Sequence, residues 1–427
     1  MTNATRLELL PGVHLTAVQT KKFKSSALGV QFLLPLSAQD ASLNALTPMV
    51  LRRGTERCPD MESLSAALDE LYGGSLEPVV RKKGETQCVG FVGSFLDDAY
   101  TLGGERVLEP AAELLGEVLL RPCTQDGVFR LDYVRQEQAN LIDRIRAQVN
   151  DKRQYALIRV VAEMCADEPF GVDKLGSEAA AAAITAASLW NAYQEMLRTA
   201  PVEFYYCGSA ELERVRSALE PVLQALPGGG VRRAPARPQQ KSAPAVPRRT
   251  EEVLDVTQGK LSMGLRTGGI DVWSGEFPAL LLCNALFGGT TTSKLFLNVR
   301  ERLSLCYYAS SQLEKYKGVM LVSSGVEFGK VEQAEAEILA QLEQCRQGSF
   351  EDWELESARR SVVSGYRSIL DSQGRLEDFW LGQAAAGIDE GPEGLCARLE
   401  QVTREQAAAA AQKLSLDTVY FLKGKEA

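Results

Sequence analysis

The sequence predicts an α+β protein made of two similar halves, each a mainly antiparallel sheet with helices packed on one face. Two observations predict this fold: the same order of strand and helix patterns occurs twice in the 427 residues, and a stretch rich in proline, glycine and arginine separates the two copies. The first copy opens with a β-rich run at Leu28–Leu34, and the second opens with one at Leu261–Arg266. Strands mixed with long helices in this order are typical of helices that cover one face of an antiparallel sheet.

Each half then continues through matching elements. Residues of alternating character predict strands, and apolar residues recurring every three or four positions predict amphipathic helices. In chain order the matched pairs are strands at Val89–Phe95 and Val319–Gly325, amphipathic helices at Leu108–Leu120 and Val331–Cys345, longer charged helices near 129–149 and 352–370, and last strands at Val202–Cys207 and Asp417–Leu422. An alanine-rich helical stretch precedes each last strand. The spacing between matched elements differs, so the halves are repeats with insertions and deletions.

A linker is expected between the halves. The stretch from Pro227 to Arg249 has few apolar residues, many prolines and a local positive charge. Such a segment cannot bury enough surface to fold by itself, so it is interpreted as a solvated hinge. The expected organisation is an N-terminal domain at 1–226, a linker at 227–250 and a C-terminal domain at 251–427.

Composition excludes several classes of function. The net charge of −9 argues against a nucleic-acid partner, because phosphates require a concentrated basic face. The first residues lack the basic and apolar regions of a secretory signal, and no apolar run is long enough to span a bilayer. We therefore expect a cytoplasmic protein without a membrane partner.

Metal ligands are scarce. The only histidine is His14, which lies in an apolar run and is interpreted as a strand or turn residue, whereas catalytic zinc normally takes three protein ligands, mostly imidazoles. The nine cysteines are scattered and form no C-x-x-C pair, so they are interpreted as reduced, buried thiols. No metal or other cofactor is expected in this chain.

Two motifs resemble a known peptidase family. Ala45–Met49 is followed by Leu-Arg-Arg-Gly-Thr-Glu-Arg-Cys-Pro at 51–59, and Phe-Gly-Gly-Thr-Thr-Thr-Ser-Lys-Leu-Phe at 287–296 is followed by an Arg-Glu pair and a later tyrosine. At these spacings the chain resembles the M16 family, the pitrilysin or insulinase-like peptidases, over nearly its whole length. The resemblance implies two similar halves that are joined by a linker and close like a clamshell around a peptide.

The resemblance also identifies a degenerate zinc site. In active members an H-x-x-E-H helix supplies two zinc ligands and a general base. Here the two ligand positions are Ala45 and Met49, the base position is Pro48, and the third ligand position, on a later helix, falls on Arg144. Alanine has no donor atom, thioether sulfur does not suit zinc, and arginine brings a positive charge. The chain alone is therefore expected to bind no zinc and to cleave no peptide.

A second pair of family positions is intact. Arg300 and Tyr307 match the arginine and tyrosine that, in active members, reach across to the zinc site and stabilise the scissile carbonyl. The residues just before Tyr307 lack the glycine that active members often have there. The alternative interpretation is that Arg300 forms an ordinary ion pair with a nearby glutamate and Tyr307 packs in the sheet.

The resemblance favours a non-catalytic subunit. In family members that divide the work, one subunit carries H-x-x-E-H and the other supplies the Arg/Tyr pair, so we expect a zinc-bearing M16 partner, a heterodimer and a peptide substrate. Within the family the chain is most similar to the bacterial non-metal type associated with 5-aminopentanol modification of elongation factor P. Two alternatives stay open: a structural or peptide-binding protein in which the pair is a relic, and different chemistry at Glu137, Asp143 and Cys58, which no spacing supports.

Overall fold

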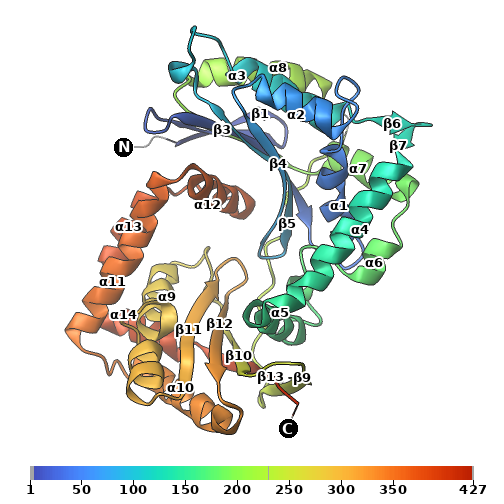
Figure 1. The fold of residues 1–427 in the computed structure, drawn as a ribbon. Coiled ribbons are helices and arrows are strands. Elements are labelled where there is room, and N and C mark those ends of the chain that lie inside the picture. Colours follow the sequence, from blue (N-terminus) through green and yellow to red (C-terminus); the bar gives the residue numbers. More distant parts are fainter. Residues whose placement is uncertain (1–3, 229, 426–427) are drawn as a thin grey trace. The chain divides into compact units, whose positions relative to one another are not determined.

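The computed structural model describes residues 4–228 and 230–425, and it divides into two compact units. Unit 1 comprises residues 1–146, 173–236 and 372–387, and unit 2 comprises 147–172, 237–371 and 388–427. Each unit is a mainly antiparallel sheet with helices, as the sequence predicts (Figure 1). None of the described helices is both long and apolar enough to cross a membrane.

Unit 1 contains a six-stranded sheet of order β1-β2-β8-β3-β5-β4, in which only β2 and β8 run parallel. Its strands are β1 (Ala4–Leu10), β2 (Val13–Gln19), β3 (Ser25–Pro35), β4 (Ser75–Lys83), β5 (Thr86–Leu96) and β8 (Val202–Gly208), with a small hairpin of β6 (Thr124–Gln125) and β7 (Val128–Phe129). Its helices are α1 (Ala41–Leu51), α2 (Met61–Asp69), α3 (Leu108–Leu120), α4 (Leu131–Ala147), α6 (Glu178–Ala182), α7 (Ala186–Thr199), α8 (Leu212–Ala225) and α12 (Gln373–Ala386).

Unit 2 repeats this plan with a five-stranded sheet of order β11-β12-β10-β13-β9, in which only β13 and β9 run parallel. Its strands are β9 (Arg248–Val253), β10 (Gly259–Arg266), β11 (Cys306–Glu314), β12 (Val319–Val326) and β13 (Ser415–Lys423). Its helices are α5 (Lys152–Met164), α9 (Phe277–Asn284), α10 (Val331–Arg346), α11 (Asp352–Arg367), α13 (Pro392–Glu400) and α14 (Arg404–Gln412), with π-helical segments η4 (Ala285–Gly289) and η5 (Leu295–Arg302).

The compact units and the two sequence halves are different divisions of the chain. Helix α12 comes from the second sequence half, yet Leu381 packs on Leu33 and Cys88 of the unit 1 sheet. Helix α5 comes from the first half and packs on the unit 2 sheet, where Val160 shares a core with Tyr420. These are the faces opposite the main helical layers, so each sheet has one additional helix contributed by the other half of the sequence.

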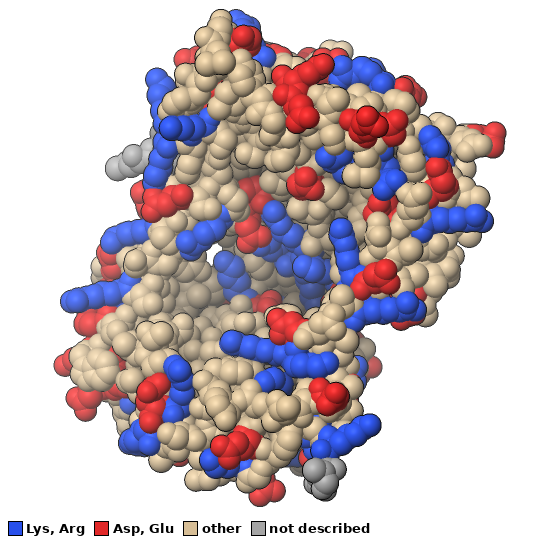
Figure 2. Space-filling view, viewed as in Figure 1, with Lys and Arg blue, Asp and Glu red and all other residues tan. Residues whose placement is uncertain are grey.

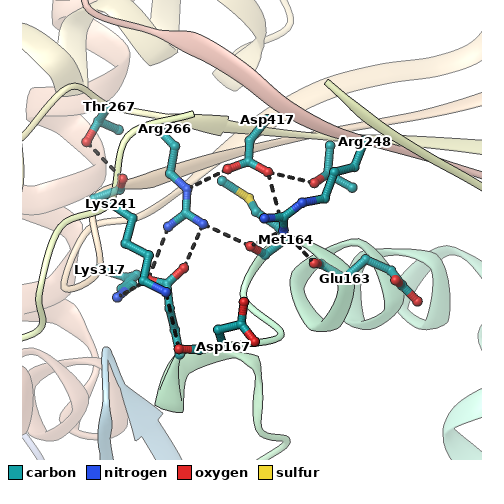
Figure 3. A network of polar contacts seen from close by, with 12 residues as sticks. Glu163, Met164, Asp167, Lys241, Arg248, Arg266, Thr267, Lys317 and Asp417 are labelled. Carbon is teal, nitrogen blue, oxygen red and sulfur yellow. Dashed lines mark hydrogen bonds and ion pairs between the residues drawn. The ribbon is translucent and has the colours of Figure 1, made fainter. Parts of the chain in front are cut away.

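A buried charge network fixes the α5 segment within unit 2 (Figure 3). Arg266 on β10 donates to Glu168 at 2.7 Å, to Asp417 at 2.9 Å and to the Met164 carbonyl at 2.9 Å. The Lys317 ammonium lies 2.6 Å from Glu168, and both of these side chains are almost completely buried. Because buried charges are tolerated only when they are paired and hydrogen-bonded, this network ties the turn after α5 to β10.

The segment predicted as a linker has internal contacts as well as exposed residues. Its described residues have no regular secondary structure until β9 begins at Arg248. Within unit 1 the Arg232 guanidinium donates to the carbonyls of Ala200 and Leu197 at 2.6 and 2.8 Å, and burial lowers its pKa. Within unit 2 Arg237 donates to Asp271 at 3.1 Å. The basic residues of this segment are thus partly used to anchor it, which the sequence-based interpretation as a solvated hinge did not include.

On the face shown in Figure 2, acidic and basic side chains are interspersed over both units.

His14 lies on β2, with Nδ1 3.2 Å from a Glu203 carboxylate oxygen. All nine cysteines are free, and eight of them are buried. Burial raises the pKa of Cys88 and of Cys345 to about 12, so these two thiols are protonated at neutral pH.

Candidate functional site

The degenerate zinc-site positions on α1 lie inside the apolar core of unit 1. Ala45 and Met49 are 0% and 5% exposed, and Pro48 is also buried. Positions 45 and 49 are four apart, so both side chains lie on the same face of the helix. Proline has no N–H and leaves the carbonyl four residues before it without its helical donor. The helix nevertheless continues past Pro48, because Arg52 N–H donates to the Pro48 carbonyl at 3.2 Å.

The structure brings Arg144 to this face. Arg144 lies in the last turn of α4, and its Nη1 is 3.9 Å from the Met49 sulfur although the two residues are 95 positions apart in sequence. Within the described part of the chain, Arg144 makes no hydrogen bond or ion pair with Ala45 or Pro48. The described residues contain no group of three histidine, cysteine, aspartate or glutamate side chains that could hold a metal ion.

The residues of the alternative site, Glu137, Asp143 and Cys58, lie in three different environments. Glu137 is largely buried and pairs with Arg53 at 3.3 Å. Asn140 donates to the same carboxylate at 3.2 Å. Cys58 is buried in the core, whereas Asp143 is exposed on the surface of α4. The residues of the third sequence-based alternative are therefore spread between a structural ion pair, the core and solvent, and they do not form one site.

The glycine-rich motif of the second half forms two π-helical segments, η4 and η5. Polar side chains hold them in place: Lys294 pairs with Glu354 at 3.0 Å in a buried position, and Thr292 Oγ1 lies 2.8 Å from Ser357 Oγ on α11. At Gly288 any Cβ would lie 2.7 Å from the backbone nitrogen of Ser311 on β11, so only glycine fits this close approach. Segments of π-helix occur frequently at functional sites.

Arg300 lies near the end of η5 and is accessible. Its guanidinium is 4.7 Å from the centre of the Phe296 ring and 3.4 Å from the Glu301 carboxylate. The side chain is 41% exposed, so these contacts restrain it without burying it. The local ion pair is the one expected if Arg300 has a purely structural role, while its exposure leaves its donors available.

Tyr307 lies where the ladder between β11 and β12 is irregular. Cys306 pairs with Val326 and Tyr308 pairs with Gly325, which leaves Tyr307 as the extra residue of a bulge. Tyr307 is 65% exposed, so it does not pack in the sheet. Ser304, three residues before Tyr307, has φ of 49° and therefore adopts the left-handed conformation that favours glycine.

The sequence reasoning expected a peptide to add to a sheet edge but did not say which strands form the edges. The described strands β4 and β1 end the unit 1 sheet, and β11 and β9 end the unit 2 sheet. β4 contains Pro78 together with Arg81, Lys82 and Lys83, and proline and lysine are common on edge strands. These residues were a usable sequence signal. β11 carries Tyr307 and is open on one side among the described residues.

Comparisons with known proteins agree with the motifs. The family model "Peptidase M16 inactive domain" matches residues 183–362. A Bacillus subtilis (strain 168) protein named "Probable inactive metalloprotease YmfF" is 34% identical over 417 residues, which is 97% of this chain and 96% of that protein. A Mycobacterium tuberculosis (strain ATCC 25618 / H37Rv) protein named as an uncharacterized zinc protease is 25% identical over 327 residues, or 74% of this chain and 71% of that one.

Solved structures show the same fold. A crystal structure of a conserved protein from Enterococcus faecalis V583 has a TM-score of 0.89 and 29% identity, covering 99% of both chains. A structure from Pseudomonas fluorescens described as a peptidase M16 inactive domain has a TM-score of 0.81 and 18% identity, covering 100% of this chain and 99% of that one. The resemblance predicted from the motifs is thus confirmed, and this chain belongs to the M16 peptidase family as an inactive homologue of its metallopeptidases.

Proposed function

We propose that this chain is the non-catalytic subunit of a heteromeric metallopeptidase, which binds peptide and completes the active site of a zinc-bearing M16 partner. One observation carries the proposal: Arg300 and Tyr307 keep the family spacing and are 41% and 65% exposed. By contrast, Ala45, Pro48 and Met49 are buried, and the described residues contain no group of histidine, cysteine, aspartate or glutamate side chains that could hold a metal ion. Guanidinium and phenol groups are suitable donors to an oxyanion that develops on a scissile carbonyl.

Peptide binding is proposed to use strand addition. An edge strand presents unpaired N–H and C=O groups, to which an extended peptide can add as a further strand. β11 and β4 are edge strands among the described residues, and β11 also carries Tyr307. The main chain of the peptide supplies most of the hydrogen bonds in this mode, so a wide range of sequences can be held.

A second candidate is a non-enzymatic, peptide-binding or structural homologue. The Arg300–Glu301 ion pair and the Arg300–Phe296 contact favour it, because they give Arg300 a local role that needs no partner. In that case the Arg/Tyr pair is a relic, and removing it affects only the chain's own surface.

Co-purification from the native source, combined with metal analysis, separates the two candidates. The proposal expects the chain to elute with a second M16 protein that carries H-x-x-E-H, with zinc in proportion to that partner. Elution of the chain alone or with copies of itself, without zinc, would favour the non-enzymatic candidate. The expected association with elongation factor P modification stays a prediction, which deletion of the gene and analysis of that modification would test.

A further inference from the structure

The sheet face that α5 covers in unit 2 carries a polar patch beyond the apolar contacts of that helix. Tyr308, Gly325 and Lys260 lie opposite one another on β11, β12 and β10. Residues opposite in an antiparallel sheet point to the same face. The next row on that face consists of Ser310, Ser323 and Ser262. We refer to these six residues together with Arg153 as the tyrosine–serine patch.

The patch contains buried hydroxyl groups that lack partners. The Tyr308 hydroxyl and Ser262 Oγ are buried and make no hydrogen bond of acceptable geometry with described residues. Burial raises the pKa of Tyr308, and this effect outweighs the hydroxyl of Ser323 and the charge of Arg153, which both lower it. The ring packs directly against Gly325, where any Cβ would lie 2.5 Å from it. Unpaired buried hydroxyls are costly and point to a missing hydrogen-bond acceptor.

Two cations flank these hydroxyls. The Arg153 guanidinium lies 4.3 Å from the Tyr308 ring centre and donates to Ser310 Oγ at 2.9 Å. Lys260 Nζ lies 5.9 Å from the same ring and donates to the neutral Gln258 amide oxygen at 2.5 Å. Burial, followed by repulsion from Arg153, lowers the pKa of Lys260. Neither cation forms a salt bridge with a described carboxylate.

We propose that the tyrosine–serine patch binds the carboxylate of an acidic side chain of a peptide. Lys260 and Arg153 supply charge, and the hydroxyls of Tyr308 and Ser262 supply donors that now lack acceptors. Asp151 is the nearby acid that offsets part of this charge; it caps the N-terminus of α5 and raises the pKa of Lys260. Two cations and one carboxylate leave one net positive charge, which matches a monoanion better than a dianionic phosphate.

Arg153 controls access to the patch. Its side chain is exposed, and its guanidinium lies over one face of the Tyr308 ring. Rotation of the arginine off the ring exchanges a cation–π contact and a hydrogen bond to a neutral hydroxyl for an ion pair with the carboxylate of the ligand. Because β11 is an edge strand, a peptide added to it places side chains next to Tyr308 and Ser310. The peptide source of the carboxylate rests on the proposed function.

The test uses two fluorescein-labelled octapeptides that are identical except for a central glutamate or glutamine. Fluorescence anisotropy with the full chain at low salt measures both affinities. We expect the glutamate peptide to bind about tenfold more tightly, as for a charge-assisted pair, and Lys260→Met or Arg153→Met to remove most of that preference. Tyr308→Phe removes a hydrogen-bond donor and should weaken binding of the glutamate peptide but not of the glutamine peptide. The control is Lys330→Met, which removes an exposed lysine that pairs with Glu327 at 3.0 Å and should change neither affinity.

Equal binding of the two peptides, or an unchanged preference in both cation variants, would overturn the carboxylate site. So would inorganic phosphate that competes better than acetate at equal concentration, because it would identify the patch as a phosphate site. Assembly with the partner and turnover of the glutamine peptide are measured in parallel. Assembly and turnover depend on the proposed function and not on Lys260. Failure of the carboxylate site is therefore distinguished from failure of the proposed function.

Discussion

Arg144 Nη1 lies 3.9 Å from the sulfur of Met49, and this contact joins two positions that the family resemblance matches to zinc ligands. Sulfur of a thioether is a weak hydrogen-bond acceptor and carries no formal charge. The guanidinium therefore places a permanent positive charge beside the face of α1 where a divalent cation would have to bind. Replacement of the ligands and addition of a cation both disfavour metal binding at this face.

We expect the isolated chain to bind no stoichiometric zinc and to hydrolyse no peptide. Catalytic zinc requires three protein ligands and an open position, and Ala45, Met49 and Arg144 supply none of them. Metal analysis after dialysis against dilute zinc, together with a peptide cleavage assay, checks this. Tight one-to-one zinc with chelator-sensitive proteolysis would contradict it.

Restoring only the α1 motif should fail. The triple variant Ala45→His, Pro48→Glu and Met49→His rebuilds H-x-x-E-H but leaves Arg144 next to the second histidine, where its charge opposes the metal. The matched control adds Arg144→Glu, which supplies an anionic ligand. Isothermal titration with zinc should show much tighter binding in the quadruple variant than in the triple one. Robust activity of the triple variant would mean that the third ligand position lies elsewhere.

Loss of Arg300 or Tyr307 should lower turnover of the assembled heteromer more than it weakens peptide binding. Donors to a developing oxyanion act mainly in the transition state, so Arg300→Ala or Tyr307→Phe should each lower kcat by about a hundredfold. Arg302→Ala, an exposed arginine on the same π-helical segment, is the control. Gel filtration confirms assembly before kinetics are measured. Unchanged turnover in both variants would refute the action in trans.

Breaking the buried network should destabilise unit 2. Arg266→Met leaves Glu168 and Asp417 buried without their main partner, and loss of one partner of a buried ion pair costs about 3–5 kcal/mol. Arg367→Met removes an exposed ion pair with Glu400 at 2.9 Å and should cost at most about 1 kcal/mol. Urea unfolding followed by circular dichroism compares the two, and equal midpoints would contradict a stabilising role of the network.

The same network predicts loss of stability in acid. Burial alone would raise the pKa of Glu168, but hydrogen bonds and charge from Arg266 and Lys317 outweigh it and hold the pKa below its ordinary value. A carboxyl whose pKa is lower in the folded than in the unfolded chain stabilises the fold above the unfolded pKa, about 4.3, and loses this contribution as the pH falls through the folded pKa. The urea midpoint should therefore fall more steeply below about pH 4 in the parent than in Glu168→Gln, because the amide does not titrate. Parallel pH profiles would contradict this.

Local pattern was enough to locate many elements. The predicted helix at Leu108–Leu120 has the same bounds as α3, and the predicted strands at Val319–Gly325 and Val202–Cys207 lie within β12 and β8. In these segments the apolar residues recur at a regular spacing, and most of them are buried in the structure. The two-residue hairpin strands and the edge strand β4 were not predicted, because short or polar strands have weak periodicity and depend on their neighbours for pairing.

The sequence by itself determined the family, the two repeated halves, the absence of zinc-binding chemistry at Ala45, Pro48 and Met49, and the presence of Arg300 and Tyr307. Residue type and spacing carry that information directly. Only the tertiary structure decided that α5 and α12 pack on the sheet of the other half, since an amphipathic helix specifies an apolar face but not the surface that covers it. The same reason applies to the tyrosine–serine patch: its residues come from four separate elements, and only packing brings them together and leaves the Tyr308 and Ser262 hydroxyls without partners among the described residues.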